Sequence, residues 1–136
     1  MRLLIAVLLI AACACSGGDN DDTPASIPTA VTTPTPADRL NDEGYFCSPT
    51  PAAAEQFTST SEVCRVDEEN VSLYTFATLD DREQWRTEVN AKTCDVFAGR
   101  TFYTVELETT VIAPVSEKLA RDLASVLGAE LHTLNC

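Results

Sequence analysis

Several residue types on which enzymatic and metal chemistry depends are scarce in this chain of 136 residues. The sequence holds one histidine, His132, and its single methionine is the first residue. Metal and haem sites draw on clusters of His, Met or free Cys side chains, so we predict no metal site and no cofactor. A C-x-x-C motif, a G-x-S-x-G nucleophile elbow and a glycine-rich phosphate loop are also missing. We therefore predict no catalytic residues and expect a protein that is not an enzyme.

Basic side chains are few as well. Only two residues are lysines, Lys92 and Lys118, and the formal net charge is −12. Nucleic-acid binding needs clustered Lys and Arg side chains to neutralise phosphates, so this composition argues against nucleic acid as a partner. It argues equally against docking on anionic lipid through a basic patch. The excess of acidic residues is typical of a soluble surface, with a cation-binding surface as the alternative.

No apolar run is long enough to cross a bilayer, which takes ~20 apolar residues. The longest run, 3–12, is about half that length, and Ser16-Gly17-Gly18 follow soon after it. Arg2 supplies a positive charge before the run, and small residues follow it. This order is typical of an export signal peptide, and we favour that interpretation over a short membrane anchor helix.

The end of this segment resembles the bacterial lipobox, in which an apolar residue and two small residues precede a cysteine. The resemblance implies that diacylglycerol alkylates the thiol and that cleavage makes this cysteine the new N-terminus. Such a protein is held at the extracytoplasmic face of the cell membrane by its lipid. Ile10-Ala11-Ala12-Cys13 matches the pattern more closely, and Ala12-Cys13-Ala14-Cys15 matches it more loosely.

Two arguments nevertheless favour Cys15 as the lipidated residue over Cys13. Cleavage before Cys13 would leave an unusually short signal peptide. Lipidation of Cys15 also leaves an even set of cysteines, whereas lipidation of Cys13 leaves Cys15 as an odd thiol in an oxidising compartment. Both cysteines stay open at this point.

The chain divides into three segments. Residues 1–14 are the predicted signal peptide, 15–41 a lipid-anchored disordered tether rich in Thr, Pro and Asp, and 42–136 a folded domain. The middle segment shows no hydrophobic periodicity and has too few large apolar residues to collapse, and its prolines favour extended backbone. The sequence therefore predicts a small domain carried away from the membrane on a long connection.

Four cysteines fall in the predicted domain, and in an exported chain of this size they indicate two disulfide bonds. Their spacing leaves all three possible pairings open. A redox pair or a zinc site is the alternative, and the dispersed spacing of the thiols speaks against both. The four residues are Cys47, Cys64, Cys94 and Cys136.

Apolar periodicity predicts four strands and two helices in the order β-β-α-β-α-β. We expect an α+β fold, a two-layer sandwich with a mixed four-stranded sheet and both helices on one face. The arrangement resembles small actinobacterial lipoprotein domains of unknown function, and this resemblance implies no activity. The predicted strands are 62–67, 71–76, 100–108 and 129–134, with helices capped by Thr78 and opened by Pro114 and a C-cap at Gly128.

A few single residues remain as candidates for function. We interpret Trp85, the only tryptophan, as the core anchor of the first helix, and His132 as a surface side chain of the last strand. Glu106 and Glu108 share one strand face, where exposed acids are common, so we do not read them as a catalytic pair. The residues 44–61 are expected to cover the open sheet face unless a partner does so.

These observations predict a non-enzymatic interaction or ligand-binding module of the cell envelope. Its partners would be the membrane, through the N-terminal lipid, and a cell-envelope protein or wall polymer. The alternatives are an accessory hydrolase or inhibitor acting on wall polymers, and a redox or metal module. A deep pocket lined by Glu106, Glu108 or His132 would favour the hydrolase, whereas a flat sheet face would not.

Overall fold

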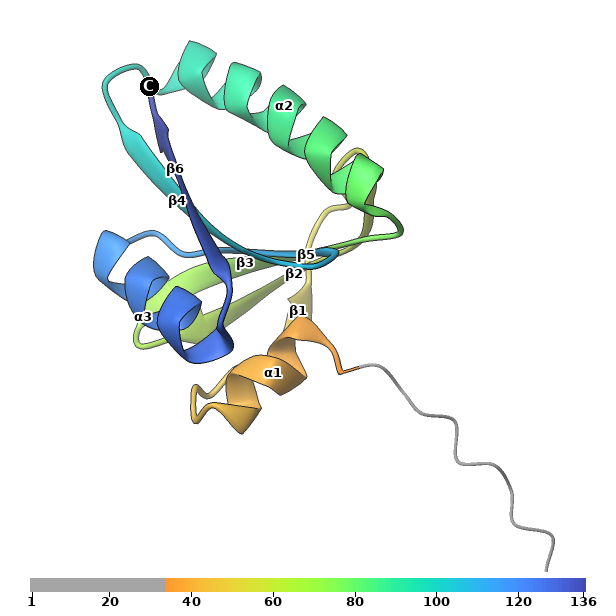
Figure 1. The fold of residues 1–136 in the computed structure, drawn as a ribbon, viewed down its shortest axis with the longest axis vertical. Helices are drawn as coiled ribbons and strands as arrows, with labels where there is room; N and C mark the ends of the chain where they lie inside the picture. Colours follow the sequence, from red (N-terminus) through yellow and green to blue (C-terminus); the bar gives the residue numbers. More distant parts are fainter. Residues whose placement is uncertain (1–33) are drawn as a thin grey trace, which may run out of the picture. The chain divides into compact units, whose positions relative to one another are not determined.

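The computed structural model describes residues 34–136 (Figure 1). The predicted signal peptide 1–14, the two lipidation candidates Cys13 and Cys15 and most of the predicted tether lie outside the described residues. Unlike the prediction, the folded part contains three helices and six strands. In chain order they are α1 (Pro36–Asp42), β1 (Thr50–Pro51), β2 (Thr58–Val66), β3 (Glu69–Phe76), α2 (Leu79–Val96), β4 (Thr101–Leu107), β5 (Thr110–Ala113), α3 (Glu117–Leu127) and β6 (Glu130–Asn135).

All six strands belong to one sheet with the order β1-β2-β3-β5-β4-β6, and every neighbouring pair is antiparallel. The predicted strands 62–67 and 71–76 correspond to β2 and β3, which pair as a hairpin. Its turn consists of Asp67 and Glu68, with φ of 47° and 69°, so it begins at the last residue of the first predicted strand. Two positive φ values in succession are those of a type I′ turn, whose twist matches that of the flanking strands.

The α+β class is confirmed, but the predicted mixed sheet of four strands is wrong. Strand β5 was not predicted. It is four residues long, and it runs antiparallel to β4 after a tight turn. Glu108 makes this reversal possible with a φ of 51°. Because β5 lies between β3 and β4, and β4 lies between β5 and β6, each helical connection joins two parallel strands that have one antiparallel strand between them.

Helices cover both faces of the sheet, so the predicted placement of the helices on one face is also wrong. In Figure 1, α2 lies on one side of the sheet, and α3 and α1 lie on the other. Leu73, Val105 and Ile112 pack with α1 and α3, whereas Tyr74 and Val111 belong to the cluster around α2. The central strands carry apolar side chains on both faces. A helix must therefore pack on each face to bury these side chains away from water.

The folded domain begins earlier than the boundary predicted at residue 42. Thr35 caps α1, and its hydroxyl accepts a hydrogen bond from the Asp38 backbone N–H at 3.2 Å. Ala37 and Leu40 of this helix are buried in the core, and Leu40 is 0% exposed. The segment predicted as tether therefore contains a structural helix at its end. A helix of seven residues is too short to show the periodicity on which sequence analysis relies.

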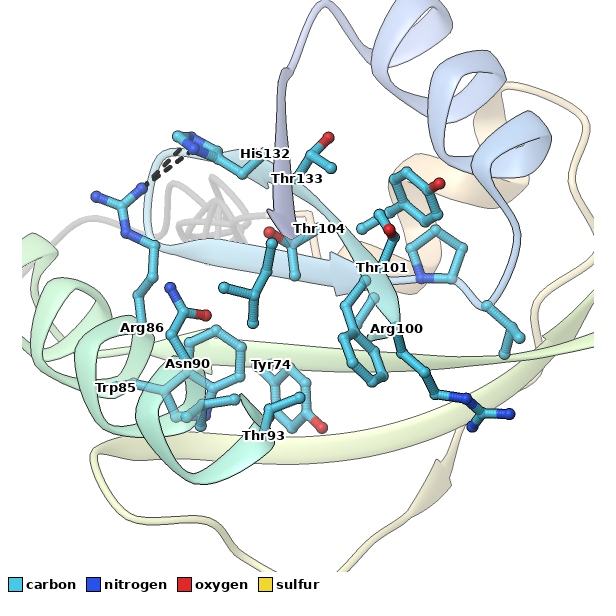
Figure 2. Close-up of a pocket in the computed structure, with 17 residues that line it drawn as sticks. Tyr74, Trp85, Arg86, Asn90, Thr93, Arg100, Thr101, Thr104, His132 and Thr133 are labelled. Carbon is cyan, nitrogen blue, oxygen red and sulfur yellow. Dashed lines mark hydrogen bonds between the residues drawn. The ribbon is translucent and has the colours of Figure 1, made fainter. Parts of the chain in front are cut away.

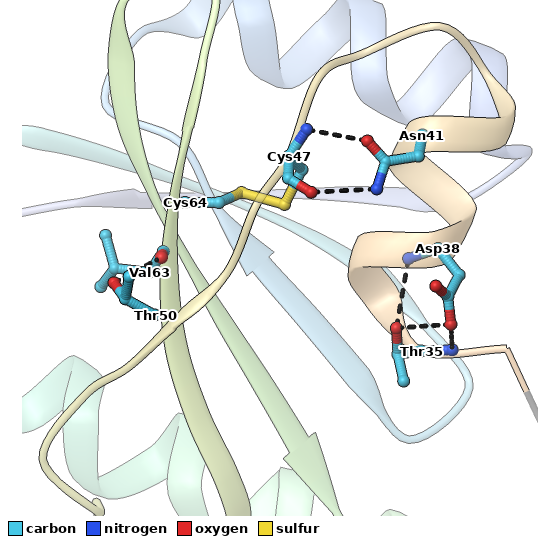
Figure 3. The surroundings of a disulfide bond; sticks show 7 residues. All are labelled: Thr35, Asp38, Asn41, Cys47, Thr50, Val63 and Cys64. Atoms are coloured by element: carbon cyan, nitrogen blue, oxygen red, sulfur yellow. Dashed lines mark hydrogen bonds between the residues drawn. A yellow bond between two sulfur atoms is a disulfide. The ribbon is translucent and has the colours of Figure 1, made fainter.

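Two disulfide bonds join the four cysteines, as predicted, and the structure resolves the pairing. Cys47 is bonded to Cys64 and Cys94 to Cys136. Figure 3 shows the first bond beside α1, where the Asn41 amide both donates to and accepts from the Cys47 backbone at 2.9 Å. With sequence separations of 17 and 42, the chain-entropy relation gives each bond about 3–4 kcal/mol of stabilisation.

The predicted helix ends are largely confirmed. The Thr78 hydroxyl accepts from the Asp81 backbone N–H at 3.1 Å, as a cap of α2 should. Gly128 ends α3 with a φ of 61°, which a residue without a side chain adopts at no steric cost. Pro114, in contrast, lies outside α3, because Ser116 is the residue that caps it.

The burial of α1 leads to a test of the domain boundary. We expect Leu40→Ala to lower the free energy of unfolding by about 2–5 kcal/mol, because it leaves a cavity in the core. Urea unfolding followed by circular dichroism measures this change. The matched control is Leu79→Ala, since Leu79 is 53% exposed and its loss should cost less than about 0.5 kcal/mol. Equal stabilities of the two variants would show that α1 is not part of the folded unit.

Candidate functional site

A cavity of about 720 Å³ lies between α2 and the sheet (Figure 2). One wall is the inner face of α2, and the other is formed by strands β3, β5, β4 and β6. Its lining is mainly apolar, with a few polar groups, and its volume falls within the ~300–1,000 Å³ usual for small-molecule sites. Among the residues that line it are Trp85, Val89, Thr93, Phe102, Thr104 and Leu134.

Local structure explains why these side chains converge. Trp85, Val89 and Thr93 follow one another at intervals of four residues, so they lie along one face of α2. On β4, Phe102 and Thr104 point to the same face because side chains alternate along a strand. The pairing of Thr104 with His132 continues this face onto β6. The cavity is thus built from a helical and a strand periodicity that face each other.

An aromatic cluster attaches the N-terminal half of α2 to the sheet. The Trp85 ring lies 5.0 Å from that of Tyr74 and 5.4 Å from that of Phe76, between centroids. The Glu55 carboxylate accepts hydrogen bonds from Trp85 Nε1 at 2.7 Å and from the Tyr74 hydroxyl at 3.1 Å. Burial raises the pKa of the Tyr74 hydroxyl, which therefore keeps its proton and acts as the donor at neutral pH.

A group of charged residues closes one end of the cavity. The Glu106 side chain is 1% exposed, and its Oε2 lies 3.4 Å from Nε of Arg82, 3.4 Å from Nη1 of Arg86 and 3.6 Å from Nε2 of His132. Hydrogen bonds from Arg82 and Arg86 lower the pKa of the Glu83 carboxyl and keep it ionised. In Figure 2, Arg86 reaches from α2 to His132 on β6, so this cluster bridges the helix and the far edge of the sheet.

The opposite end of the cavity is held by a covalent bond. Cys94, in the last turn of α2, is joined to Cys136, which follows β6. The Cys136 backbone N–H donates to the Arg100 carbonyl at 2.9 Å, and the rings of Phe97 and Phe102 pack at 5.7 Å. Both ends of α2 are therefore fixed to the sheet, and the cavity lies between them.

The rim at the disulfide end exposes apolar side chains. Val115, which lines the cavity, is 72% exposed, and Val96 and Phe97, which follow the helical wall in the chain, are 71% and 43% exposed. Arg100 also lines the cavity, and its guanidinium lies 6.0 Å from the centre of the Phe97 ring. Figure 2 shows Arg100 on the other side of the cavity from Arg86 and His132. This rim combines an apolar surface with one cation.

The four residues considered as candidates for function lie at different places relative to the cavity. Trp85 is confirmed as a core residue and also borders the cavity. His132 lies in the cavity wall, half-buried, rather than on the open surface as predicted. The prediction of an exposed Glu106 is wrong, because its partners Arg82 and Arg86 cover it. Glu108 lies in the tight turn after β4, and its side chain pairs with Arg39 at 3.5 Å.

Several polar residues that line the cavity were not predicted from the sequence, above all Arg86, Arg100 and Thr93. A signal for Thr93 was present, because it extends the stripe of Trp85 and Val89 by another four residues. No comparable signal marked the arginines, since their roles depend on which strand lies opposite α2.

Within residues 34–136, no cluster of His, Cys, Asp and Glu side chains is suited to hold a metal ion. The same part of the chain contains no helix long and apolar enough to span a membrane. Comparison with models of protein families, with curated proteins and with solved structures finds no match to this chain. The properties of the site therefore have to be argued from its own geometry.

The burial of Glu106 generates a test of the charged cluster. Glu106→Gln removes the negative charge that two arginines share, and we expect it to lower the free energy of unfolding by about 3 kcal/mol. Chemical denaturation at neutral pH measures the loss. Glu108→Gln is the matched control, because its carboxylate is 73% exposed and its pair with Arg39 should contribute less than about 1 kcal/mol. A Glu106 variant as stable as this control would contradict the bridging role.

Proposed function

We propose that this protein is a membrane-anchored extracytoplasmic lipoprotein whose domain binds a small ligand with an apolar body, without catalysing a reaction. The cavity between α2 and the sheet carries this proposal. It is concave, mainly apolar and supplied with a few polar groups, which is the composition of sites that hold small molecules. The cavity favours a small ligand over a wall polymer or a flat protein surface as the binding partner.

The surroundings of the acidic residues favour binding over hydrolysis. A wall-polymer hydrolase would need a pair of carboxylates that face its substrate. Glu106 and Glu108 do not line the cavity, and Glu106 has Arg82 and Arg86 as ion partners. His132 does line the cavity, but one histidine does not supply the pair of carboxylates that such hydrolysis needs. A redox module is disfavoured because neither disulfide joins the cysteines of a C-x-x-C motif, the two bonds spanning separations of 17 and 42 residues.

The cysteine pairing also supports the anchor. Because Cys47, Cys64, Cys94 and Cys136 pair with one another, the remaining cysteines of the chain are Cys13 and Cys15. Lipidation of Cys15 after removal of 1–14 accounts for both, since it discards one and modifies the other. Several acyl chains, at ~0.8 kcal/mol for each buried CH₂, would hold the protein firmly at the membrane.

The anchor is tested by the intact mass of the protein extracted from membranes of a lipoprotein-processing bacterium. We expect a mature chain that begins at Cys15 and carries acyl groups. The Cys15→Ser variant should lose this modification and leave the membrane fraction. A mature chain that begins at Cys13 would contradict the parity argument, and an unmodified N-terminus would contradict the anchor itself.

Ligand binding is tested with N-phenylnaphthylamine, a neutral apolar dye that fluoresces when it leaves water. Trp85 is the only tryptophan and borders the cavity, so dye bound there should accept excitation energy from it. We expect saturable energy transfer in the wild type. Thr93→Phe fills part of the cavity and should weaken dye binding about tenfold or more.

Thr87→Phe is the matched control for this experiment. Thr87 lies exposed on the same helix and does not line the cavity, so its substitution should leave dye affinity unchanged. Thermal unfolding of both variants confirms that each is folded. Absence of saturable transfer in the wild type, or equal affinities of the two variants, would overturn the proposed site.

A further inference from the structure

We infer that the ligand of this cavity is a single-chain amphiphile with an anionic head group, held at its head by Arg100 and by its hydrocarbon chain along α2. The inference rests on the proposed function and specifies the chemistry of its ligand. It follows from a difference between the arginines at the two ends of the cavity. Only one of these arginines is available to bind a ligand.

The cation at the closed end is already neutralised. Arg86 pairs with Glu83, and its Nη1 lies 3.4 Å from Glu106 Oε2. Its side chain is only 28% exposed, and His132 lies against it. An anionic group that entered here would meet two carboxylates whose charges already balance the arginines. This end is therefore not suited to a negatively charged head.

The cation at the rim is free. Among the ion pairs of residues 34–136, arginine partners are Arg39, Arg82, Arg86 and Arg121, so Arg100 and Arg65 are the two arginines without one. Arg65 is exposed on β2 and does not line the cavity, whereas Arg100 does. In a chain with a net charge of −12, an arginine beside the cavity without an acidic partner is the local exception that attracts an anion, and Figure 2 shows its side chain extending outward from the cavity, where a head group would lie.

The apolar neighbours of Arg100 strengthen this assignment. Phe97 lies beneath the guanidinium, and Val115 borders the same mouth. Apolar surface on either side lowers the competition from water, so a charged hydrogen bond to a carboxylate or phosphate gains strength there. The same exposed side chains offer contact to the first methylene groups below the head.

The length of the cavity suits an extended chain. From Thr93 back to Trp85, the part of α2 that lines the cavity advances by eight residues, which at 1.5 Å per residue is about 12 Å. Along this path the helix presents Thr93 and Val89, and the sheet presents Phe102 and Leu134. One hydrocarbon chain can lie on this surface with its head at Arg100 and its end near Trp85.

Displacement of the bound naphthylamine dye tests the head group. Palmitate, cetyl phosphate and cetyl alcohol share one chain length, differ in the head, and are added below the concentrations at which they form micelles. We expect palmitate or cetyl phosphate to displace the dye at about tenfold lower concentration than cetyl alcohol, as one charged hydrogen bond predicts. The two anions distinguish a carboxylate ligand from a phosphate ligand.

Variants then assign the effect to Arg100. Arg100→Gln should weaken the anionic amphiphiles about tenfold and leave cetyl alcohol unchanged, and Arg100→Lys should retain most of the preference. Arg65→Gln removes an equal charge away from the cavity and should change nothing. The exposed position of Arg100 means that these variants fold, which thermal unfolding verifies.

The outcomes of these experiments distinguish the inferred anionic head group from the proposed ligand binding on which it rests. Equal displacement by anionic and neutral amphiphiles, or an equal effect of Arg100→Gln on all three, overturns the assignment of an anionic head while ligand binding stands. Failure of the dye and all three amphiphiles to bind overturns the proposed function together with the inference.

Discussion

The attachment of α2 to the sheet at both of its ends is the constraint on which the rest of the site depends. A helix that covers an apolar sheet face normally packs onto it and expels water along its whole length. Here the charged cluster around Glu106 fixes one part of the helix, and the bond from Cys94 to Cys136 fixes its end. Between these points, a cavity remains, and Val89 and Thr93 line its helical wall.

The charged cluster contributes more to geometry than to net stability. A buried carboxylate loses its hydration, and its arginine partners restore only part of that free energy. Glu106 on β4 nevertheless has partners on two elements, because Arg86 comes from α2 and His132 from β6. Arg82 adds a hydrogen bond to the Glu108 carbonyl at 2.6 Å, at the turn into β5. The cluster thereby sets the position of the helix relative to three neighbouring strands.

Local patterns in the sequence predicted the features that depend on residues close together along the chain, namely paired strands and helix ends. The alternation around Val63 and Leu73 predicted the hairpin, and the cap at Thr78 and the glycine at 128 marked helix ends. The reversal at Glu108 escaped because nothing in that stretch is typical of a turn, and missing it changed the sheet from antiparallel to mixed. The cavity could not be predicted at all, since it depends on which strands α2 faces and how closely it approaches them.

The disulfide between Cys47 and Cys64 determines how the domain responds to a force that pulls on α1. A force applied from the N-terminal side of the chain enters the domain at Pro36 and acts first on α1, whose contacts are apolar packing, the Arg39–Glu108 pair and the Asn41 amide. These contacts can be pulled apart one after another. Extension then stops at Cys47, because its covalent bond to Cys64 transfers the load to β2, the strand beside the edge strand β1. The disulfide therefore limits how far α1 can be drawn away from the sheet before a covalent bond carries the load.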